Sequence, residues 1–419
     1  MFADRFRLSA GGIYLLMGAW GGFAFALIMA SYALYYITIA HLDALQLVLV
    51  GTALEASYFL FEIPTGVLAD TFSRRMSVIV GLAIIGVAWV GQGLIPTFVA
   101  IASFEIVRGV GEAFVHGATE AWVAGEVGDD ALNALFLRET QVSQIAGFVG
   151  LPVGVGLALI DLRIPVVLGG VLTAALAIAL IFVMPERHHP RREVARSWRA
   201  TVSTANRALW SVRTSALLVA LLGAEFFWGA ASEGYDRLWD PHLLLDLSFP
   251  PFGLAPVVGF GVLSLAGTAV AILTAQLVRR RLKQLDERVL PRFLITIQLV
   301  RIAGRAAFAL APSLGIALIG SFVEPMVRGS FHPLFTSWLI RRTDEQVRAT
   351  VLSTTSVSNA LGQITGGPVS GVIGKGYGIS LGLVSSAVML APAVLFFARA
   401  VSRSTTQRSA PVSEDAKSP

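Results

Sequence analysis

The chain has 419 residues, of which 55% are hydrophobic and 14% are charged, and it contains no cysteine. A typical soluble domain carries about 25% charged residues, so this composition, with a mean hydropathy of +0.71, excludes an ordinary soluble protein. The absence of cysteine excludes disulfides, thiol catalysis and thiolate metal sites. We therefore predict an all-α membrane protein.

Twelve stretches are long and apolar enough to cross a bilayer, which takes about 20 mostly apolar residues. They are centred on residues 11–38, 45–69, 76–95, 97–124, 131–160, 164–184, 214–238, 253–278, 290–311, 313–340, 349–373 and 378–399. The first stretch is too long for a cleavable signal peptide, so we expect it to remain as a span.

The basic residues predict the orientation of these spans. With both termini in the cytoplasm, the inner segments hold 25 of the 32 lysines and arginines, and the outer loops hold only Arg163 and Lys375. Such an imbalance is typical of membrane proteins and accounts for the net charge of +5, so we expect no nucleic-acid partner. Only 3 of the 32 basic residues are lysine, which indicates a GC-rich bacterial genome and hence a multi-pass protein of the inner membrane.

The loop between the second and third spans carries Gly66, Asp70, Arg74 and Arg75. This spacing resembles the loop signature of the major facilitator superfamily: glycine, three residues, aspartate, three residues and two basic residues. Ser73 stands where that signature usually has a small glycine. The resemblance implies two six-helix bundles that alternate access by rocking, and a cavity lined by spans 1, 4, 7 and 10. It also implies that Asp70 helps to latch the cytoplasmic side of one conformation.

A narrower resemblance rests on two short segments. The run from Glu62 to Gly66, together with Ala121-Trp122 in the fourth span, is similar to the drug:proton antiporter branch that contains macrolide and tetracycline efflux proteins.

Five ionisable residues share one face of the predicted span 97–124: Glu105, Arg108, Glu112, His116 and Glu120. At about 100° per residue they fall within an arc of about 120°. Four charges facing lipid would cost on the order of 10 kcal/mol, so this face must border protein or a water-filled cavity. We predict a proton site at Glu112. Burial there favours the neutral carboxyl group, whereas the charge of Arg108 favours the ionised one. A permanently ionised Glu112–Arg108 pair is the alternative.

A weak internal repeat predicts how the chain is divided. His116 and Trp122 recur as His332 and Trp338, 216 residues later. We predict bundles at residues 1–184 and 214–400, related by a pseudo-two-fold axis along the membrane normal. The hydrophilic stretch 185–213 between them is either a segment on the membrane surface or a plain charged linker. We expect residues 401–419 to be a disordered cytoplasmic tail.

The predicted span 214–238 repeats the charged pattern. Glu225, Glu233, Asp236, Arg237 and Asp240 again fall within an arc of about 120°. Glu233 and Arg237 are spaced for an ion pair. The alternative is that Asp236, Arg237 and Asp240 simply mark the outer membrane boundary, which is the interpretation we favour for Asp240. Glu225 lies deeper and is our second choice for the proton site.

Spans 9 and 10 carry further buried charge. Glu324 and Arg328 are four residues apart in span 10, and Arg301 and Arg305 are four apart in span 9. We predict that Glu324 and Arg328 border the cavity. The alternative is internal neutralisation, in which Glu324 pairs with Arg328 and the span 9 arginines pair with the acids of span 7.

Prolines and glycines mark spans 5 and 11. Gly367, Pro368 and Gly371 in span 11 resemble an antiporter signature that is usual in span 5, where Pro152 belongs to a degraded version. These residues either pack helices closely or bend during gating.

We predict a secondary transporter and no enzyme. Proton-driven efflux of a small amphipathic molecule is favoured by the buried acids and the antiporter-like motif, and proton-coupled nutrient symport is the alternative. The hypothesis of a membrane enzyme would be supported by Asp129-Asp130 alone. The hypothesis of a channel fits poorly with a repeat of two halves. We expect a monomer in the lipid bilayer whose partners are a substrate and a proton. We expect no metal, cofactor or ATP-binding loop.

Overall fold

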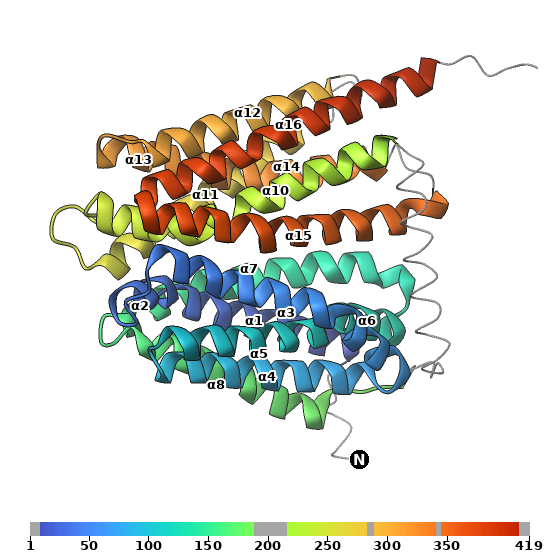
Figure 1. Cartoon of the computed structure of the whole chain (residues 1–419). Coiled ribbons are helices and arrows are strands. Elements are labelled where there is room, and N and C mark those ends of the chain that lie inside the picture. Colours follow the sequence, from blue (N-terminus) through green and yellow to red (C-terminus); the bar gives the residue numbers. More distant parts are fainter. Residues whose placement is uncertain (1–8, 188–215, 283–288, 341–344, 410–419) are drawn as a thin grey trace, which may run out of the picture. The chain divides into compact units, whose positions relative to one another are not determined.

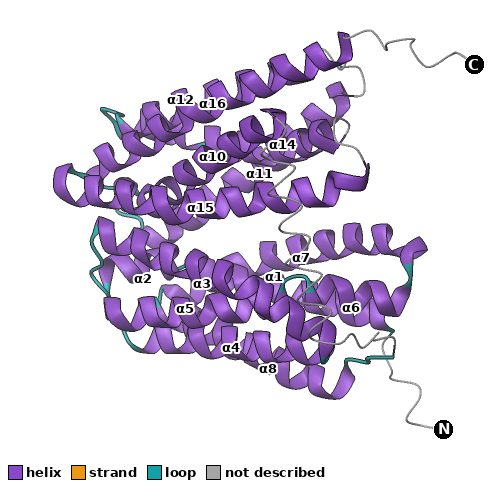
Figure 2. Cartoon of the chain, turned by 45° about the vertical axis from the view of Figure 1, so that its right-hand side comes forward, coloured by secondary structure: helices purple, strands orange, loops and turns teal. Residues whose placement is uncertain are grey.

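The computed structural model describes residues 9–187, 216–282, 289–340 and 345–409, and within these ranges it contains helices and no strand (Figures 1 and 2). In chain order the elements are α1 (Ala10–Met29), α2 (Tyr32–Thr38), α3 (Ala44–Thr71), α4 (Arg74–Leu94), α5 (Phe98–Val115), α6 (Ala118–Val127), α7 (Asp129–Ala158), α8 (Arg163–Val183), α10 (Ala216–Pro241), the π-helical turn η1 (His242–Asp246), α11 (Pro256–Leu282), α12 (Leu290–Ala309), α13 (Leu314–Ser321), α14 (Val323–Ile340), α15 (Glu345–Tyr377) and α16 (Ile379–Ser409). Four spans are interrupted: α1 with α2, α5 with α6, α10 with η1, and α13 with α14 each make one. The described helices thus form the twelve predicted spans.

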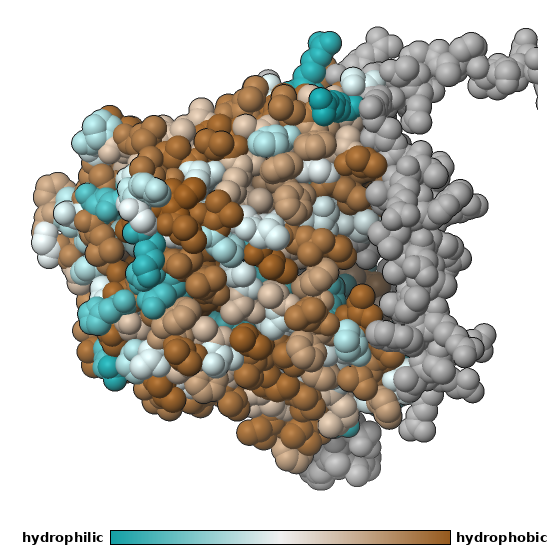
Figure 3. All heavy atoms as spheres, viewed as in Figure 1, coloured by the Kyte–Doolittle hydropathy of each residue, from teal (hydrophilic) through white to brown (hydrophobic). Residues whose placement is uncertain are grey.

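Seven of these spans are long and apolar enough to cross a membrane by length and composition alone: α1 with α2, α3, α4, α7, α8, α11 and α16. The other five contain an interruption or many polar residues, such as Glu225 and Glu233 in α10. Figure 3 shows apolar side chains over most of the visible face, with hydrophilic ones gathered at the left of the view. An apolar surface over the middle of the helices suits contact with lipid.

Side-chain caps fix where several helices begin. Asp43 accepts a hydrogen bond from the Gln46 N–H at 2.9 Å, and the Gln46 side chain accepts from the Asp43 N–H at 3.1 Å. Ser73 accepts from the Met76 N–H at 2.9 Å at the start of α4 and donates to Glu186 at 2.6 Å. A glycine could make neither bond, which explains the serine in the loop signature.

Small residues bring neighbouring helices of the first half together. α1 packs along α7, α4 along α5 and α8, and α3 along α5. A Cβ added at Gly150 would lie 2.6 Å from the Phe23 carbonyl oxygen, and one at Gly154 would lie 2.7 Å from that of Leu27. Pro152 lies between these glycines inside the continuous helix α7. The contacts support the packing role of this motif.

The second half repeats this arrangement with α15 against α10. A Cβ added at Gly362 would overlap the Phe226 carbonyl oxygen, and one at Gly366 would overlap the Ala230 Cα. Pro368 lies inside the continuous helix α15. Small residues thus pack span 11 on span 7 as they pack span 5 on span 1.

The two tryptophans of the predicted repeat lie in the two main cores. Trp122 is 2% exposed in a core built from α1, α3, α4, α6, α7 and α8, and its Nε1 donates to the Pro185 carbonyl at 2.6 Å. Trp338 is 2% exposed in a core built from α10, α12, α14, α15 and α16. Equivalent buried positions are what a duplicated six-helix unit predicts.

Packing divides the chain into two compact units. Unit 1 comprises Met1–Val202, Glu233–Ala266 and Gly367–Gly382, and unit 2 comprises Ser203–Ser232, Gly267–Gly366 and Leu383–Pro419. This division follows contacts, whereas the predicted division at 1–184 and 214–400 follows the repeat. Most of the predicted linker, at residues 188–215, lies outside the described residues.

Two predicted element bounds are corrected. The span 97–124 is not one helix, because Gly117 has a φ of +74°, between α5 and α6. Glycine adopts this left-handed conformation without steric cost, so the helix ends there. At the other end, α16 continues to Ser409, beyond the expected start of a disordered tail at residue 401. No glycine or proline interrupts the chain between Val401 and Ser409.

Candidate functional site

Arg108 of α5 is held between two carboxylates of its own helix. Its Nη2 lies 2.7 Å from Glu105 Oε2, and its Nη1 lies 2.5 Å from Glu112 Oε1. The Glu105 side chain is 1% exposed, whereas that of Glu112 is 43% exposed. The structure therefore shows the Glu112–Arg108 ion pair, the alternative to a proton site at Glu112.

Buried polar and aromatic groups complete the surroundings of Arg108. The Tyr36 hydroxyl donates to the Gln92 side-chain oxygen and lies 3.4 Å from Glu105 Oε1. The Arg108 guanidinium lies 4.7 Å from the centre of the Trp89 ring, which adds a cation–π contact. Tyr36 belongs to α2, in the first span. Gln92 was not predicted, since one glutamine in an apolar span carries no pattern.

His116 and Glu120 do not continue the charged face of α5. Both are exposed, His116 at the break before Gly117 and Glu120 in the first turn of α6. The His116 ring packs edge-on against Tyr58, with 5.8 Å between ring centres. The prediction of one charged wall from Glu105 to Glu120 is wrong, because the left-handed glycine interrupts the helical register.

A second ion pair lies on α10 within unit 1. Arg237 Nε is 2.9 Å from Glu233 Oε1, which confirms the predicted pair, and Glu233 is 4% exposed. The pair packs on α3, where a Cβ added at Gly51 would overlap Glu233 Oε1. A small cavity beside the pair is lined by Tyr32, Ala33, Tyr36, Ile37, Leu47, Asp236, Arg237, Asp240 and Pro241. Asp236 and Asp240 thus border a polar cavity in addition to marking the end of the span.

Unit 1 also contains an ion pair between α15 and the residue that caps α3. Lys375 Nζ lies 2.9 Å from Asp43 Oδ2, and both side chains are more than a third exposed. Burial raises the pKa of Asp43, but the Gln46 N–H and the Lys375 ammonium outweigh it and hold the pKa below its ordinary value. The charge distribution of the chain places this contact on the predicted outer side.

The antiporter-like residues of α15 pack against the same region. A Cβ added at Gly367 would lie 2.9 Å from Glu233 Cγ, and one at Gly371 would lie 3.2 Å from Val48 Cβ on α3. The motif therefore lets α15 approach both the Glu233–Arg237 pair and α3.

Glu225 of α10, in unit 2, has different surroundings. It is 9% exposed, and Asn359 Nδ2 of α15 donates to its Oε2 at 3.0 Å. Gln363 donates in turn to Asn359 Oδ1 at 3.0 Å. No ion pair reaches Glu225 from the described part of the chain. It is a buried carboxyl group that is held by an amide.

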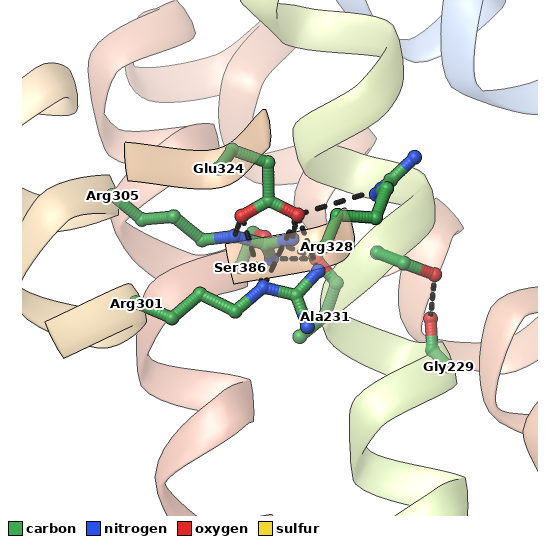
Figure 4. A network of polar contacts seen from close by, with 8 residues as sticks. Gly229, Ala231, Arg301, Arg305, Glu324, Arg328 and Ser386 are labelled. Atoms are coloured by element: carbon green, nitrogen blue, oxygen red, sulfur yellow. Dashed lines mark hydrogen bonds and ion pairs between the residues drawn. The ribbon is translucent and has the colours of Figure 1, made fainter. Parts of the chain in front are cut away.

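Three arginines of unit 2 surround Glu324 (Figure 4). Glu324 is 7% exposed and accepts hydrogen bonds from Arg301 and Arg305 of α12, including 2.9 Å from Arg301 Nε and 3.0 Å from Arg305 Nη2. Arg328 Nη2 lies 3.5 Å from the same carboxylate. Arg305 reaches α10 through the Ala231 carbonyl, at 2.6 Å. The span 9 arginines therefore pair with Glu324 and not with the predicted span 7 acids, because their side chains point toward α14.

The loop signature forms contacts within unit 1. Arg74 Nη2 lies 3.1 Å from Asp70 Oδ1, and Arg74 Nη1 donates to the Ala121 carbonyl at 2.9 Å. The Arg75 N–H donates to Glu186 at 3.1 Å. A Cβ added at Gly66 would meet no described atom within 4 Å. Asp70 thus pairs with its own loop, and a latch to the other half remains a prediction.

Two further observations concern metal binding and the predicted histidine of span 10. The described residues contain no group of three histidine, aspartate or glutamate side chains placed to hold a metal ion. The side chain of His332, which repeats His116, lies outside the described residues.

Residues 14–300 match the family model described as Major Facilitator Superfamily. An uncharacterized MFS-type transporter of Bacillus subtilis (strain 168), YxaM, is 23% identical over 389 residues, which cover 92% of this chain and 94% of that protein.

Solved transporter structures share the fold at low sequence identity. A mutant of the nucleoside transporter NupG has a TM-score of 0.74 at 14% identity, covering 94% of this chain and 99% of that one. A bacterial homologue of the human lysosomal transporter Spinster, in an inward-facing and unoccupied conformation, has a TM-score of 0.73 at 15% identity, covering 96% and 98%. A D-xylose–proton symporter has a TM-score of 0.67 at 13% identity, covering 92% and 95%.

Proposed function

Because the chain belongs to the Major Facilitator Superfamily and is a multi-pass membrane transporter of small molecules, we propose that it is driven by protons and that Glu225 carries the coupling proton. The described helices form the twelve-span, two-half fold of secondary transporters, which suits alternating access. The family is one of transporters, so a membrane enzyme has no further support.

The surroundings of Glu225 carry this proposal. The other buried glutamates among the described residues, Glu105, Glu233 and Glu324, each lie within 3 Å of an arginine nitrogen and are compensated as carboxylates. The Glu225 carboxyl group instead accepts a hydrogen bond from the neutral side-chain amide of Asn359. Burial without a cation favours the neutral acid, so the energetically reasonable way to neutralise Glu225 is a proton. A carboxyl that binds a proton when buried and loses it when wetted can couple a proton gradient to a change of state.

Export is the direction that we favour. The antiporter-like motif lies on α15, and Gly367 packs directly on Glu233. Asn359, the partner of Glu225, is on the same helix. A movement of α15 would therefore disturb both acids of α10 together. Efflux of a small amphipathic molecule is favoured by the antiporter-like motif itself, in line with the resemblance to drug:proton antiporters.

Proton-coupled nutrient symport is the second candidate. It is supported by the shared fold with the D-xylose–proton symporter and with the nucleoside transporter.

We also propose the setting in which the transporter works. Both termini lie in the cytoplasm of a bacterial inner-membrane protein, as the distribution of basic residues indicates. The protein acts as a monomer, and Asp70 latches the cytoplasmic side by exchanging Arg74 for a partner in the other half during the cycle.

Proteoliposomes with an imposed pH gradient test coupling and direction together. An antiporter accumulates its substrate in vesicles that are acidic inside, and a symporter accumulates it in vesicles that are alkaline inside. A panel of dyes, antibiotics, sugars and nucleosides should contain a compound that accumulates in acidic vesicles, and a protonophore should abolish this accumulation. Uphill accumulation that survives the protonophore would contradict proton coupling, and accumulation only in alkaline vesicles would establish symport.

A further inference from the structure

We infer that three exposed arginines of unit 2, Arg280, Arg292 and Arg399, bind the phosphate headgroups of anionic phospholipids. These three residues are here called the arginine rim. Binding of this kind involves the bilayer around the protein, so it is independent of the substrate and of the coupling proton.

The arginine rim lies beside one hydrophobic core of unit 2. Val278 of α11, Leu290 of α12 and Ala400 of α16 pack in or against the core that contains Trp338. Each rim arginine is within two residues of one of these side chains. The helices α12 and α16 also lie side by side in both cartoon views (Figures 1 and 2). The rim thus gathers at one end of unit 2, which the distribution of basic residues places on the cytoplasmic side.

The positive charge of the rim is not neutralised by the described part of the chain. All three arginines are exposed, and no hydrogen bond or ion pair joins their guanidinium groups to a described residue. The sequences of α11, α12 and α16 contain no aspartate or glutamate. The loop signature of unit 1 differs, because Arg74 there lies 3.1 Å from Asp70. The rim therefore offers three guanidinium groups to an external anion.

An exposed apolar stripe leads to each rim arginine. Leu277 lies three residues before the rim arginine of α11, Leu395 four residues before that of α16, and Leu299 about two turns after that of α12. These leucines are 59%, 66% and 53% exposed. Residues at such spacings share one face of a helix. An apolar stripe that ends in a cation matches a phospholipid, whose acyl chains lie in the bilayer core and whose phosphate lies at its surface.

The charge of the rim selects among phospholipid headgroups. Guanidinium groups bind phosphate oxygens by paired, charge-assisted hydrogen bonds. Each arginine close to an anionic membrane surface strengthens binding about fivefold. A zwitterionic headgroup carries a cation of its own, which the unpaired arginines would repel. The rim therefore fits an anionic lipid such as phosphatidylglycerol better than phosphatidylcholine.

Native mass spectrometry of the purified full-length protein in a neutral detergent tests this selectivity. Dioleoyl phosphatidylglycerol and dioleoyl phosphatidylcholine have the same acyl chains and are added at equal concentrations. We expect the apparent affinity for phosphatidylglycerol to be higher by about tenfold or more. Equal retention of the two lipids would overturn the inference.

Two triple variants of equal charge locate the binding. The first replaces all three rim arginines by glutamine. The second replaces Arg138, Arg163 and Arg187, which are exposed in unit 1 but lie on α7 and at opposite ends of α8. The rim variant should lose about tenfold or more in affinity for phosphatidylglycerol, and the unit 1 variant should lose less than about twofold. Equal losses would show that lipid retention follows net charge alone and would overturn the site.

Single variants keep the test decisive if a triple variant does not fold. Arg399→Gln should reduce the affinity for phosphatidylglycerol about fivefold, whereas Arg163→Gln should leave it unchanged. The assay uses neither a substrate nor a pH gradient, so its outcome is separate from that of the transport experiments. Unchanged affinity in Arg399→Gln would overturn the assignment of the lipid site to the rim.

Discussion

Arg108 contacts two glutamates whose environments differ sharply. Glu105 is 1% exposed and Glu112 is 43% exposed, although both lie within 3 Å of the same guanidinium. The buried contact is insulated from solvent, whereas the outer one is screened. The two pairs therefore differ in energetic weight even though their geometry is similar.

Glu105→Gln should destabilise the protein more than Glu112→Gln. Removing one partner of a buried ion pair costs about 3–5 kcal/mol, whereas half-exposed pairs contribute about 1 kcal/mol or less. Thermal unfolding of the two purified variants measures the difference, and each variant serves as the control for the other. A larger loss in Glu112→Gln would show that burial does not determine the strength of this site.

At the residue scale, the sequence identified most of the charged groups but not their partners. The helical spacing of Glu233 and Arg237 predicted their ion pair correctly, because both lie on one helix. Arg301 was recognised as a buried charge and assigned to the wrong acids, because its partner Glu324 lies on another helix. Asn359 was not recognised at all, since a partner such as Glu225 depends on how α10 and α15 pack.

The proposed coupling depends on the contact between the helices α10 and α15. Gly362 allows the two backbones to meet, and Asn359, three residues earlier, reaches Glu225. A larger residue at this point has no flexible neighbour to displace, because the nearest atom is a backbone oxygen.

Gly362→Ala should separate α10 from α15, lowering the melting temperature by several degrees and reducing transport. The added Cβ would overlap the Phe226 carbonyl oxygen. Gly376→Ala is the control on the same helix, since a Cβ there meets no described atom within 4 Å. Unfolding and flux assays on both variants provide the measurement. If Gly362→Ala were as stable and active as the control, close packing would not be required here.

At the element scale, hydropathy predicted the twelve spans but missed their interruptions. A single glycine within a helix is tolerated at a cost of about 1 kcal/mol, so Gly117 gives no clear sign of a break. The α6 segment that follows it is held by tertiary contacts such as the bond from Trp122 to the Pro185 carbonyl, which local sequence does not reveal. The break between α13 and α14 at Phe322 is flanked by Gly320 and Pro325, a local signal that hydropathy alone does not register.

The Asp43–Lys375 pair joins the first and second halves of the sequence within unit 1. Alternating access requires the predicted outer ends to separate during each cycle. Because the chain contains no cysteine, thiol chemistry can be directed to these two positions alone.

A short bis-maleimide cross-link between Asp43→Cys and Lys375→Cys should stop transport. Lys375 Nζ lies 2.9 Å from Asp43 Oδ2. Two cysteines at these positions would therefore be separated by about the length of a lysine side chain, which a bis-maleimide can span. Flux through cross-linked protein in proteoliposomes is the measurement, and each single-cysteine variant with the same reagent is the control. Full activity of the cross-linked fraction would rule out separation at this contact.

The Asp43–Lys375 pair should stabilise the protein except at strongly acidic pH, where this contribution is lost. The folded-state pKa of Asp43 lies below its ordinary value of 3.8, so its stabilising contribution is present above that value and lost as pH falls through the lowered pKa. The difference in melting temperature between the wild type and Asp43→Asn should be constant from pH 5 to 8 and should shrink below about pH 4. A difference that changes near neutral pH would contradict this assignment.

The most direct test of the account compares uphill and exchange transport by Glu225→Gln in proteoliposomes. Using a substrate identified in the pH-gradient panel, the wild type should accumulate it against its gradient and also exchange it. Glu225→Gln mimics the protonated acid, so it should lose accumulation and retain exchange, whereas Glu112→Gln should retain both. Intact uphill transport by Glu225→Gln would contradict the assignment of the coupling proton to Glu225.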